Sequence, residues 1–139
     1  MVSYVTYSNP KGCGPPQGLY THVARVPAGS DTLYIAGQLA VDLNGNRVGK
    51  HDFRAQFKKV FGNLGDVLSG VGCGWKDIAK FTTYMVHSQD IELFMEERAA
   101  LFPTLFPDGK YPPNTLLMVD RLVHEDFVIE VEAIARARE

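Results

Sequence analysis

A long amphipathic stripe near the middle of the chain constrains the fold more than any other feature. Apolar residues recur there at steps of three and four, the repeat of one helical face. They are Phe53, Phe57, Val60, Phe61, Leu64, Val67, Leu68 and Val71. Asp52 precedes the stripe as a candidate N-cap, and Gly72 follows it as a candidate stop. Because a helix with one apolar face needs another layer to bury that face, the stripe predicts a helix packed on a sheet.

The segments around this helix supply the strands and a second helix. A shorter apolar pattern over residues 91–102 predicts the second helix, which Pro103 is expected to end. The expected apolar face consists of Ile91, Phe94, Met95, Ala99 and Phe102. Runs rich in β-branched and aromatic residues predict strands. These runs cover residues 3–7, 22–26, 33–36, 78–86, 115–119 and 127–135. The order predicts one α+β domain over residues 1–139, with a mixed sheet of about six strands and two helices on one face.

Size and charge exclude several classes of function. The chain has 139 residues, enough for one core, and 14 Lys and Arg against 16 Asp and Glu give a formal charge of −2. Proteins that depend on phosphate contacts usually carry a basic excess, so we expect neither nucleic acid nor a membrane as a partner. No apolar run approaches the roughly 20 residues of a membrane span. The N-terminus lacks a signal-peptide pattern, so we expect a cytoplasmic protein.

The last two predicted strands are apolar on both faces. Residues 116–119 contain no polar position, and Val128 and Ile134 flank Glu130 and Glu132 on the second face of the final strand. Strands of this kind usually have both faces covered, whereas two helices cover only one. We therefore expect a second copy of the chain on the open face, hence a homo-oligomer. A monomer with a partly exposed sheet is the alternative.

No pattern in the chain predicts a metal or a cofactor. The histidines lack the i, i+4 pairing of a zinc helix. They are His22, His51, His87 and His124. Cys13 and Cys73 are too few for a disulfide framework and are expected to be reduced thiols. Gly62 and Gly65 lie inside the predicted helix, where helix packing explains them better than a phosphate loop does.

Glu130 and Glu132 form the most interesting constellation of residue types. They lie two apart in a predicted strand and therefore share a face. Partial burial there raises the pKa of a carboxyl group, which suits proton transfer near neutral pH. The alternative is a structural role, in which a glutamate pairs with Arg121, Arg136 or a backbone amide.

Five motifs make the chain resemble the Rid family, the reactive intermediate deaminases that are also described as L-PSP endoribonuclease-like proteins. They are Ile35-Ala36-Gly37-Gln38, the 52–72 helix with Gln56 and Asn63, Asp-Ile-Ala-Lys-Phe-Thr-Thr at 77–83, Tyr111-Pro112-Pro113, and Ile-Glu-Val-Glu-Ala-Ile-Ala at 129–135. The family order and spacing are kept from Tyr20 onward. The resemblance implies a chorismate-mutase-like α+β fold and a homotrimer with small-molecule clefts at the subunit interfaces.

The resemblance also implies a reaction. The best-known family members hydrolyse enamines or imines to a keto acid and ammonia, without a cofactor or a metal. Carried over by position, Glu130 resembles the catalytic glutamate that places or activates the water. Tyr20 resembles the tyrosine that lines the cleft, and Gly37 resembles the glycine of the strand-end motif.

One part of the cleft departs from the family pattern. Asn114 stands where the family has the arginine that binds the substrate carboxylate, and Leu116 replaces a small polar residue or cysteine. A hydrogen bond to a charged group contributes about 1.5–3 kcal/mol. Its loss weakens carboxylate binding by roughly 10- to 150-fold. We therefore expect a less anionic ligand, unless Arg98 or Arg121 supplies a cation, and we count Arg98 among the substrate-binding candidates.

Three functions are compatible with these residues. The first is a cofactor-free enamine or imine deaminase with altered substrate preference, and the second is a non-catalytic ligand-binding or regulatory homotrimer. The third is an RNA-directed activity, which the older family label suggests and the charge of −2 disfavours. The glycines and prolines of residues 12–16 permit a lid over the cleft.

Overall fold

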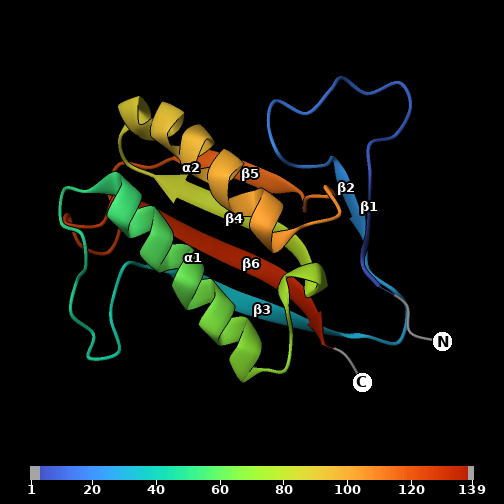
Figure 1. The fold of residues 1–139 in the computed structure, drawn as a ribbon, viewed down its shortest axis with the longest axis horizontal. Coiled ribbons are helices and arrows are strands. Elements are labelled where there is room, and N and C mark those ends of the chain that lie inside the picture. Colours follow the sequence, from blue (N-terminus) through green and yellow to red (C-terminus); the bar gives the residue numbers. More distant parts are fainter. Residues whose placement is uncertain (1–3, 138–139) are drawn as a thin grey trace.

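Two helices cover one face of a four-stranded sheet in the computed structural model, which describes residues 4–137 (Figure 1). The strands of this sheet are β3 (Asp31–Gln38), β4 (Ile78–Met85), β5 (Asn114–Met118) and β6 (Ile129–Ala137). Their order is β3-β6-β4-β5, with β4 and β5 parallel and the other pairs antiparallel. The predicted α+β architecture, with six strands and two helices on a mixed sheet, is confirmed.

The other two strands form a separate antiparallel pair. They are β1 (Thr6–Ser8) and β2 (Val23–Arg25). The neighbouring predicted strands at 22–26 and 33–36 do not pair with each other, because β2 pairs with β1 and β3 pairs with β6. Residue 3 of the first predicted strand lies outside the described residues.

Helix α1 (Phe53–Gly70) forms where its stripe predicts. The Asp52 side chain caps it by accepting a hydrogen bond from the Ala55 amide at 3.1 Å. Gly72 ends it with a φ of 74°, and the Cys73 amide then donates to the Leu68 carbonyl at 2.8 Å. Six of the eight stripe residues are buried, namely Phe53, Phe57, Val60, Phe61, Leu64 and Leu68.

Helix α2 (Ile91–Leu105) differs from its prediction in two ways. Pro103 lies inside the last turn instead of ending the helix, and the Phe106 amide still donates to the Phe102 carbonyl at 2.8 Å. The ring of a proline disturbs the turn before it, so the residues after it keep their helical bonds. The expected apolar face is partly wrong as well, because Met95 is 38% exposed whereas Arg98 is buried. Because apolar residues lie on several sides of α2, their spacing does not show which side of the helix is buried.

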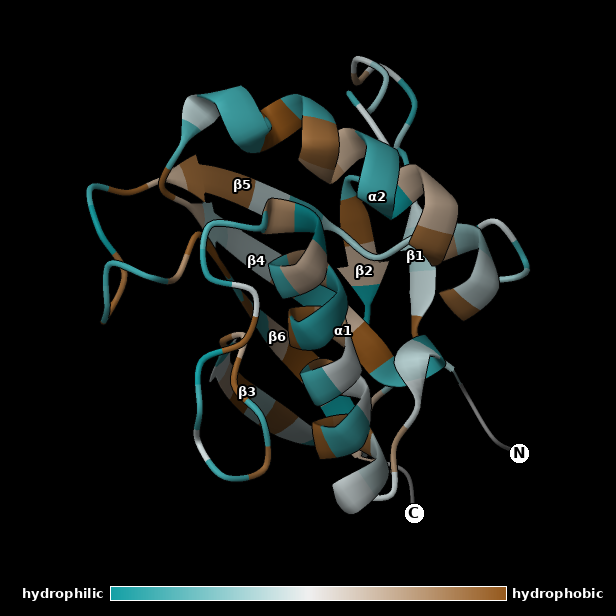
Figure 2. Ribbon diagram, turned by 60° about the vertical axis from the view of Figure 1, so that its left-hand side comes forward, coloured by the Kyte–Doolittle hydropathy of each residue, from teal (hydrophilic) through white to brown (hydrophobic). Residues whose placement is uncertain are grey.

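Phenylalanines join the two helices to the sheet. The rings of Phe57, Phe61, Phe81, Phe94 and Phe102 lie with centroids between 4.7 and 5.9 Å apart, several of them edge to face. Such pairs add to the free energy of simple apolar burial. Figure 2 shows hydrophobic residues along the end of β5, where Leu117 and Met118 are exposed.

The second face of the main sheet carries no helix within the described residues (Figure 1). Polar and apolar positions alternate along β4 as predicted, so that Lys80, Thr82 and Tyr84 lie on this open face. Tyr34 of β3 is 80% exposed and Leu117 of β5 is 43% exposed on the same side. The expected second copy of the chain on this face stays a prediction.

Candidate functional site

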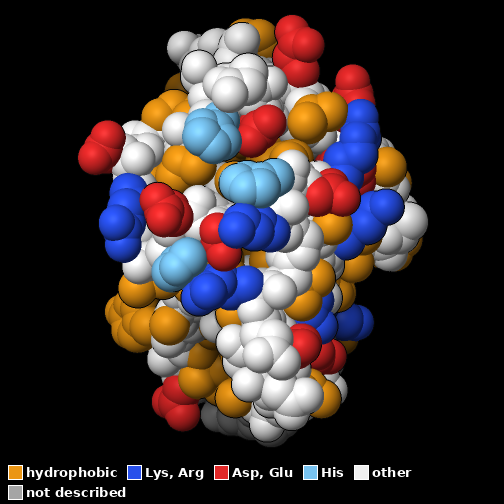
Figure 3. Space-filling view, turned by 90° about the vertical axis from the view of Figure 1, so that its left-hand side faces the viewer, with side chains coloured by type: hydrophobic (Ala, Val, Ile, Leu, Met, Phe, Trp, Pro, Cys, Tyr) orange, Lys and Arg blue, Asp and Glu red, His pale blue; other side chains and the backbone are white. Residues whose placement is uncertain are grey.

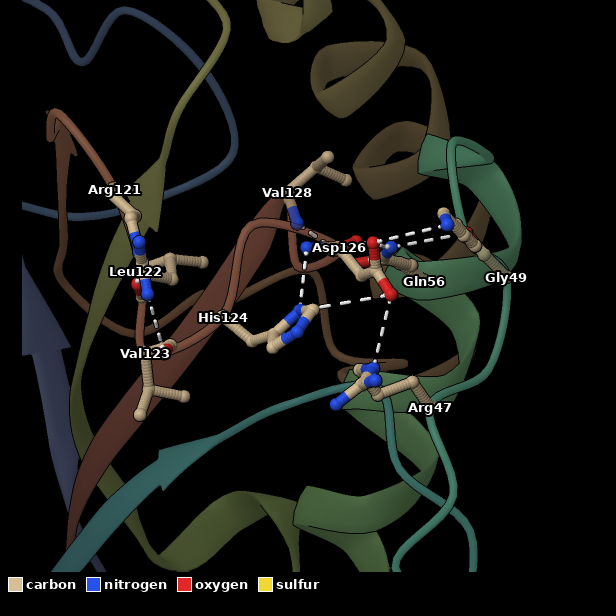
Figure 4. Close-up of polar contacts among 10 residues, drawn as sticks. Arg47, Gly49, Gln56, Arg121, Leu122, Val123, His124, Asp126 and Val128 are labelled. Atoms are coloured by element: carbon tan, nitrogen blue, oxygen red, sulfur yellow. Dashed lines mark hydrogen bonds and ion pairs between the residues drawn. The ribbon is translucent and has the colours of Figure 1, made fainter.

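Gln56 of α1 holds two loops next to the start of β6 through side-chain hydrogen bonds. The residue is 1% exposed, and its Nε2 donates to the carbonyls of Gly49 at 3.1 Å and Asp126 at 2.7 Å (Figure 4). Its Oε1 accepts the amide of Val128 at 2.9 Å. The glutamine thereby satisfies three backbone groups that no strand or helix would satisfy.

Asn63, seven residues further along the same helix, does the same for the chain that leaves β3. Its Nδ2 donates to the carbonyls of Leu39 and Val41, both at 2.9 Å. Together, the two amides fix the end of β3 and the beginning of β6, which carry Gly37 and Glu130.

Asp126 adds charge to the same loops. Its half-buried carboxylate lies 3.1 Å from Arg47 Nε and 3.6 Å from Lys50 Nζ, while His124 Nδ1 lies 3.7 Å away (Figure 4). Arg121 takes no part, because it donates to the carbonyls of its own loop at 3.2 and 3.4 Å. The face in Figure 3 intersperses cations, histidines and carboxylates, so no basic stripe forms there.

Glu130 and Gly37 meet on the open face of the sheet. The β3–β6 ladder shifts register between Ile35 and Gln38, which brings the bare backbone of Gly37 against Glu130. A Cβ at position 37 would overlap the Glu130 carboxylate and would lie 2.7 Å from its Cγ and Cδ. Position 37 therefore requires glycine because of this close approach, whatever its backbone angles.

The surroundings of Glu130 favour its protonated form. Burial raises the pKa of the Glu130 carboxyl, and the nearby charge of Glu132 raises it further. Glu132 accepts a hydrogen bond from the Tyr84 hydroxyl at 2.6 Å, so its partner is neither Arg121 nor Arg136. Arg136 instead lies 3.5 Å from Asp77.

Tyr20 and Asn114 line a hollow of about 500 Å³ where β2 and β5 flank β4. Lys80 lines the same hollow and is its only Lys or Arg. Asn114 Oδ1 accepts a hydrogen bond from the Thr83 hydroxyl at 2.9 Å, which leaves its amide nitrogen as a donor. The Tyr20 hydroxyl accepts the amide of Gln17 at 3.0 Å. The hollow thus offers neutral donors beside Asn114, whereas Lys80 reaches it from the open face of the sheet.

A single chain does not bring Asn114 and Glu130 together. Asn114 pairs with Phe81 of β4 and Glu130 pairs with Tyr84, so three residues, roughly 10 Å, separate them along the strand. Phe81 is buried under the helices, whereas Tyr84 lies on the open face. Because paired residues share a face, the two side chains leave the sheet on opposite sides.

The remaining two candidates are a partly buried leucine and a buried arginine. Leu116 is partly buried and packs against the hydrophobic core. Arg98 is 2% exposed, its guanidinium lies 4.9 Å from the centroid of the Phe94 ring, and Nη2 lies 3.2 Å from Met95 Sδ. Gly18 of the N-terminal loop lies directly against Nη2, and Arg98 is absent from the lining of the hollow. Burial lowers the pKa of Arg98, while the nearby Tyr20 raises it.

Lys80 is the residue of the hollow that motif reasoning missed. Strand alternation alone places Lys80 on the same face as Thr82 and Tyr84, and this signal could have found it. Residues 4–137 contain no group of three or more His, Cys, Asp or Glu placed to hold a metal ion. None of the helices described is long and apolar enough to cross a membrane.

Comparisons with known proteins agree with this architecture. The family model described as Endoribonuclease L-PSP matches residues 14–137. A RutC family protein of Pyrococcus horikoshii is 30% identical over 130 residues, covering 94% of this chain and 93% of the relative. The 2-iminobutanoate/2-iminopropanoate deaminase of Mus musculus is 28% identical over 104 residues, covering 75% and 73%. A solved Rid family protein of unknown function from Yersinia pestis has a TM-score of 0.84 at 29% identity, covering 96% of this chain and 99% of that one.

Proposed function

The chain is a member of the Rid family, the family described as Endoribonuclease L-PSP, and we propose that it hydrolyses enamines or imines of small metabolites without a cofactor. The observation that carries the proposal is the Glu130 carboxyl, held against Gly37 on the uncovered face with a raised pKa. A carboxyl group of this kind exchanges protons more readily near neutral pH than a fully solvated one. The cytoplasm is the proposed site of action.

The proposed reaction adds water across a carbon–nitrogen double bond. The Glu130 carboxylate takes a proton from water while the oxygen bonds to the imine carbon, and the π electrons move to nitrogen. The protonated carboxyl then returns the proton to nitrogen. The carboxylate next takes the hydroxyl proton and passes it to nitrogen. The carbon–nitrogen bond breaks as the carbon–oxygen double bond forms, so that ammonia leaves and a carbonyl compound remains. Tyr20 provides a wall and a hydrogen-bonding group of the cleft.

We further propose that the substrate is less anionic than an α-imino acid. Asn114 offers one neutral amide donor where an arginine would offer a charged fork. Lys80, as a point charge on a flexible stem, replaces only part of that interaction. Arg98 is buried beneath the N-terminal loop outside the hollow, and Arg121 is bonded to its own loop.

A homotrimer completes the proposed cleft. Glu130 and Asn114 leave opposite faces of one sheet, so the glutamate of one subunit has to meet a hollow supplied by another. The apolar side chains of the open face, such as Leu117, favour such an assembly because association removes them from water.

Ammonia release tests the proposal directly. The wild type, Glu130→Gln and Asn114→Arg are incubated with freshly generated 2-aminoacrylate and, separately, with a neutral aromatic imine. We expect the wild type to favour the neutral imine, Asn114→Arg to gain roughly 10- to 150-fold on the acid, and Glu130→Gln to lose both activities. Glu130→Gln that turns over either substrate like the wild type contradicts the assignment of Glu130.

A second candidate function is a ligand-binding or regulatory homotrimer that uses the same cleft without catalysis. The missing arginine favours it, because a family cleft without its carboxylate clamp can bind ligands and yet position no imino acid. It predicts saturable binding without consumption of the ligand. Michaelis kinetics on any imine would refute it. The interspersed charges of Figure 3 do not support an RNA-directed activity.

A further inference from the structure

Two carboxyl groups lie on the open face of β6, and their surroundings differ. Glu130 and Glu132 are two residues apart on one strand, which places their Cα atoms roughly 7 Å apart with both side chains on the same face. Gly37 packs against Glu130, whereas the Tyr84 hydroxyl donates to Glu132 at 2.6 Å. Unequal surroundings of two neighbouring titratable groups are the arrangement that divides acid and base roles between them.

Tyr84 reaches Glu132 diagonally across the sheet. Tyr84 of β4 pairs with Glu130 and Thr82 pairs with Glu132, so the tyrosine passes its direct partner and contacts the following residue on that face. A distance of 2.6 Å is typical of a hydroxyl that donates to an ionised carboxylate oxygen. The Glu130 carboxyl forms no hydrogen bond or ion pair with any residue of the described range, 4–137. The hydroxyl therefore distinguishes one carboxyl from the other.

The open face offers little positive charge to the two glutamates. Within the part of the chain that the structure describes, no cation forms an ion pair with either carboxyl. Lys80 of β4 lies on the same face and lines a hollow together with Glu132, but it is not within ion-pair distance of that carboxylate. The other titratable residues that strand pairing places on this face are Tyr34 of β3 and, at the far end of β6, Arg136 beside Asp77. The negative charge of Glu132 therefore acts on Glu130 with little compensation.

We propose that Tyr84 and Glu132 are positioning residues that assign the mobile proton of the site to Glu130. The Tyr84 hydroxyl holds Glu132 as a carboxylate, because a hydrogen-bond donor favours the charged form of its acceptor. The fixed charge of Glu132 opposes a second negative charge beside it, so a proton taken from water goes to Glu130. This inference rests on the proposed hydrolase reaction, in which Glu130 takes a proton from water and returns it to nitrogen.

Carboxyl ¹³C NMR of the full-length protein locates this proton without any substrate. Glu132→Gln keeps an acceptor for the Tyr84 hydroxyl and removes only the charge, so Glu130 should release its proton at lower pH. We expect its proton affinity to fall about two- to fivefold, as for a charge pair near the surface. In Tyr84→Phe, the first proton taken up as pH falls should be shared between both carboxyl signals. A change below twofold in Glu132→Gln overturns the role of Glu132, and a first proton that stays on Glu130 alone in Tyr84→Phe overturns the role of Tyr84.

The pH profile of ammonia release from the neutral aromatic imine tests the same assignment during turnover. In Glu132→Gln, the limb of kcat that reports ionisation of Glu130 should move to lower pH, and Glu132→Asp, which restores the charge, should return it toward the wild type. A purely structural role would lower kcat at every pH and leave the limb in place, which contradicts the proposal. Glu92→Gln is the matched control, since it removes one charge from an exposed residue of α2, and its profile should coincide with that of the wild type. If the wild type turns over no imine, the hydrolase proposal fails, while the NMR titration still confirms or refutes the place of the proton.

Discussion

Replacement of Gln56 by leucine tests whether this single amide holds the loops around the site. The side chain is 1% exposed and bonds three backbone groups, the carbonyls of Gly49 and Asp126 and the amide of Val128. Leucine has a similar size and no polar atom, so the substitution removes these bonds with little change in volume.

The expected loss follows from the exposure of the groups left behind. Val128 is 6% exposed, and a buried amide without a partner costs about 1–3 kcal/mol. The two carbonyls lie at partly exposed residues, so each loses only the net value of its bond, about 0.5–1.5 kcal/mol. The added apolar group returns about 1 kcal/mol. We expect a net loss near 3 kcal/mol, a large part of the 5–15 kcal/mol typical of a native domain.

Urea unfolding at one fixed protein concentration measures this loss, because association would otherwise shift the midpoint. Gln89→Leu is the control: it makes the same chemical change at an exposed residue and should stay within about 0.5 kcal/mol of the wild type. Gln56→Glu keeps the acceptor for Val128 but sets a carboxylate against two carbonyl oxygens, so its deficit should grow as pH rises through the carboxyl pKa. A loss below about 1 kcal/mol for Gln56→Leu would refute this account of the loops.

Three further predictions concern the site. Gly37→Ala places a Cβ against the Glu130 carboxylate, so kcat should fall through displacement of that group, and unchanged kinetics would contradict the close approach. Burial penalises ionised Glu130 in the folded state and raises its pKa, so the stability of the wild type falls as pH rises from the ordinary carboxyl pKa to the raised one. In thermal melts, Glu130→Gln should therefore match the stability of the wild type at acid pH and exceed it at neutral pH. Arg98→Met should be neutral or stabilising, since a buried guanidinium with no carboxylate partner among residues 4–137 is costly. A loss above about 2 kcal/mol would show that Arg98 holds the loop beside Tyr20.

Local signals explain which parts of the fold the sequence predicts. Asp52, the apolar stripe and Gly72 all act within a few residues of one another, so the limits of α1 agree with prediction. Strand partners depend on distant segments. No local pattern indicates that β2 pairs with β1 instead of β3. The burial of Arg98 escapes prediction for a similar reason, because the Phe94 ring and Gly18 that enclose it come from two separate elements.

The candidate site shows the same difference between local signals, which the sequence reveals, and contacts between distant segments, which it does not. Strand alternation alone places Glu130 and Glu132 on one face, and the structure agrees. The contact between Gly37 and Glu130 requires the register shift after Ile35, which a single sequence does not reveal. Lys80 in the hollow beside Asn114 likewise depends on how β2 and β5 flank β4.

The odd number of residues that separates the partners of Asn114 and Glu130 along β4 has a consequence for catalysis. Asn114 and Glu130 pair with residues of β4 that are three apart, and an odd separation always places two side chains on opposite faces. No loop movement within one chain corrects this arrangement, so joint action of the two residues requires a second copy. Activity should therefore depend on protomer concentration. Dilution below the dissociation constant of the oligomer should abolish turnover while circular dichroism still shows a folded chain. Activity per protomer that stays constant in the monomer would separate Asn114 from the reaction of Glu130.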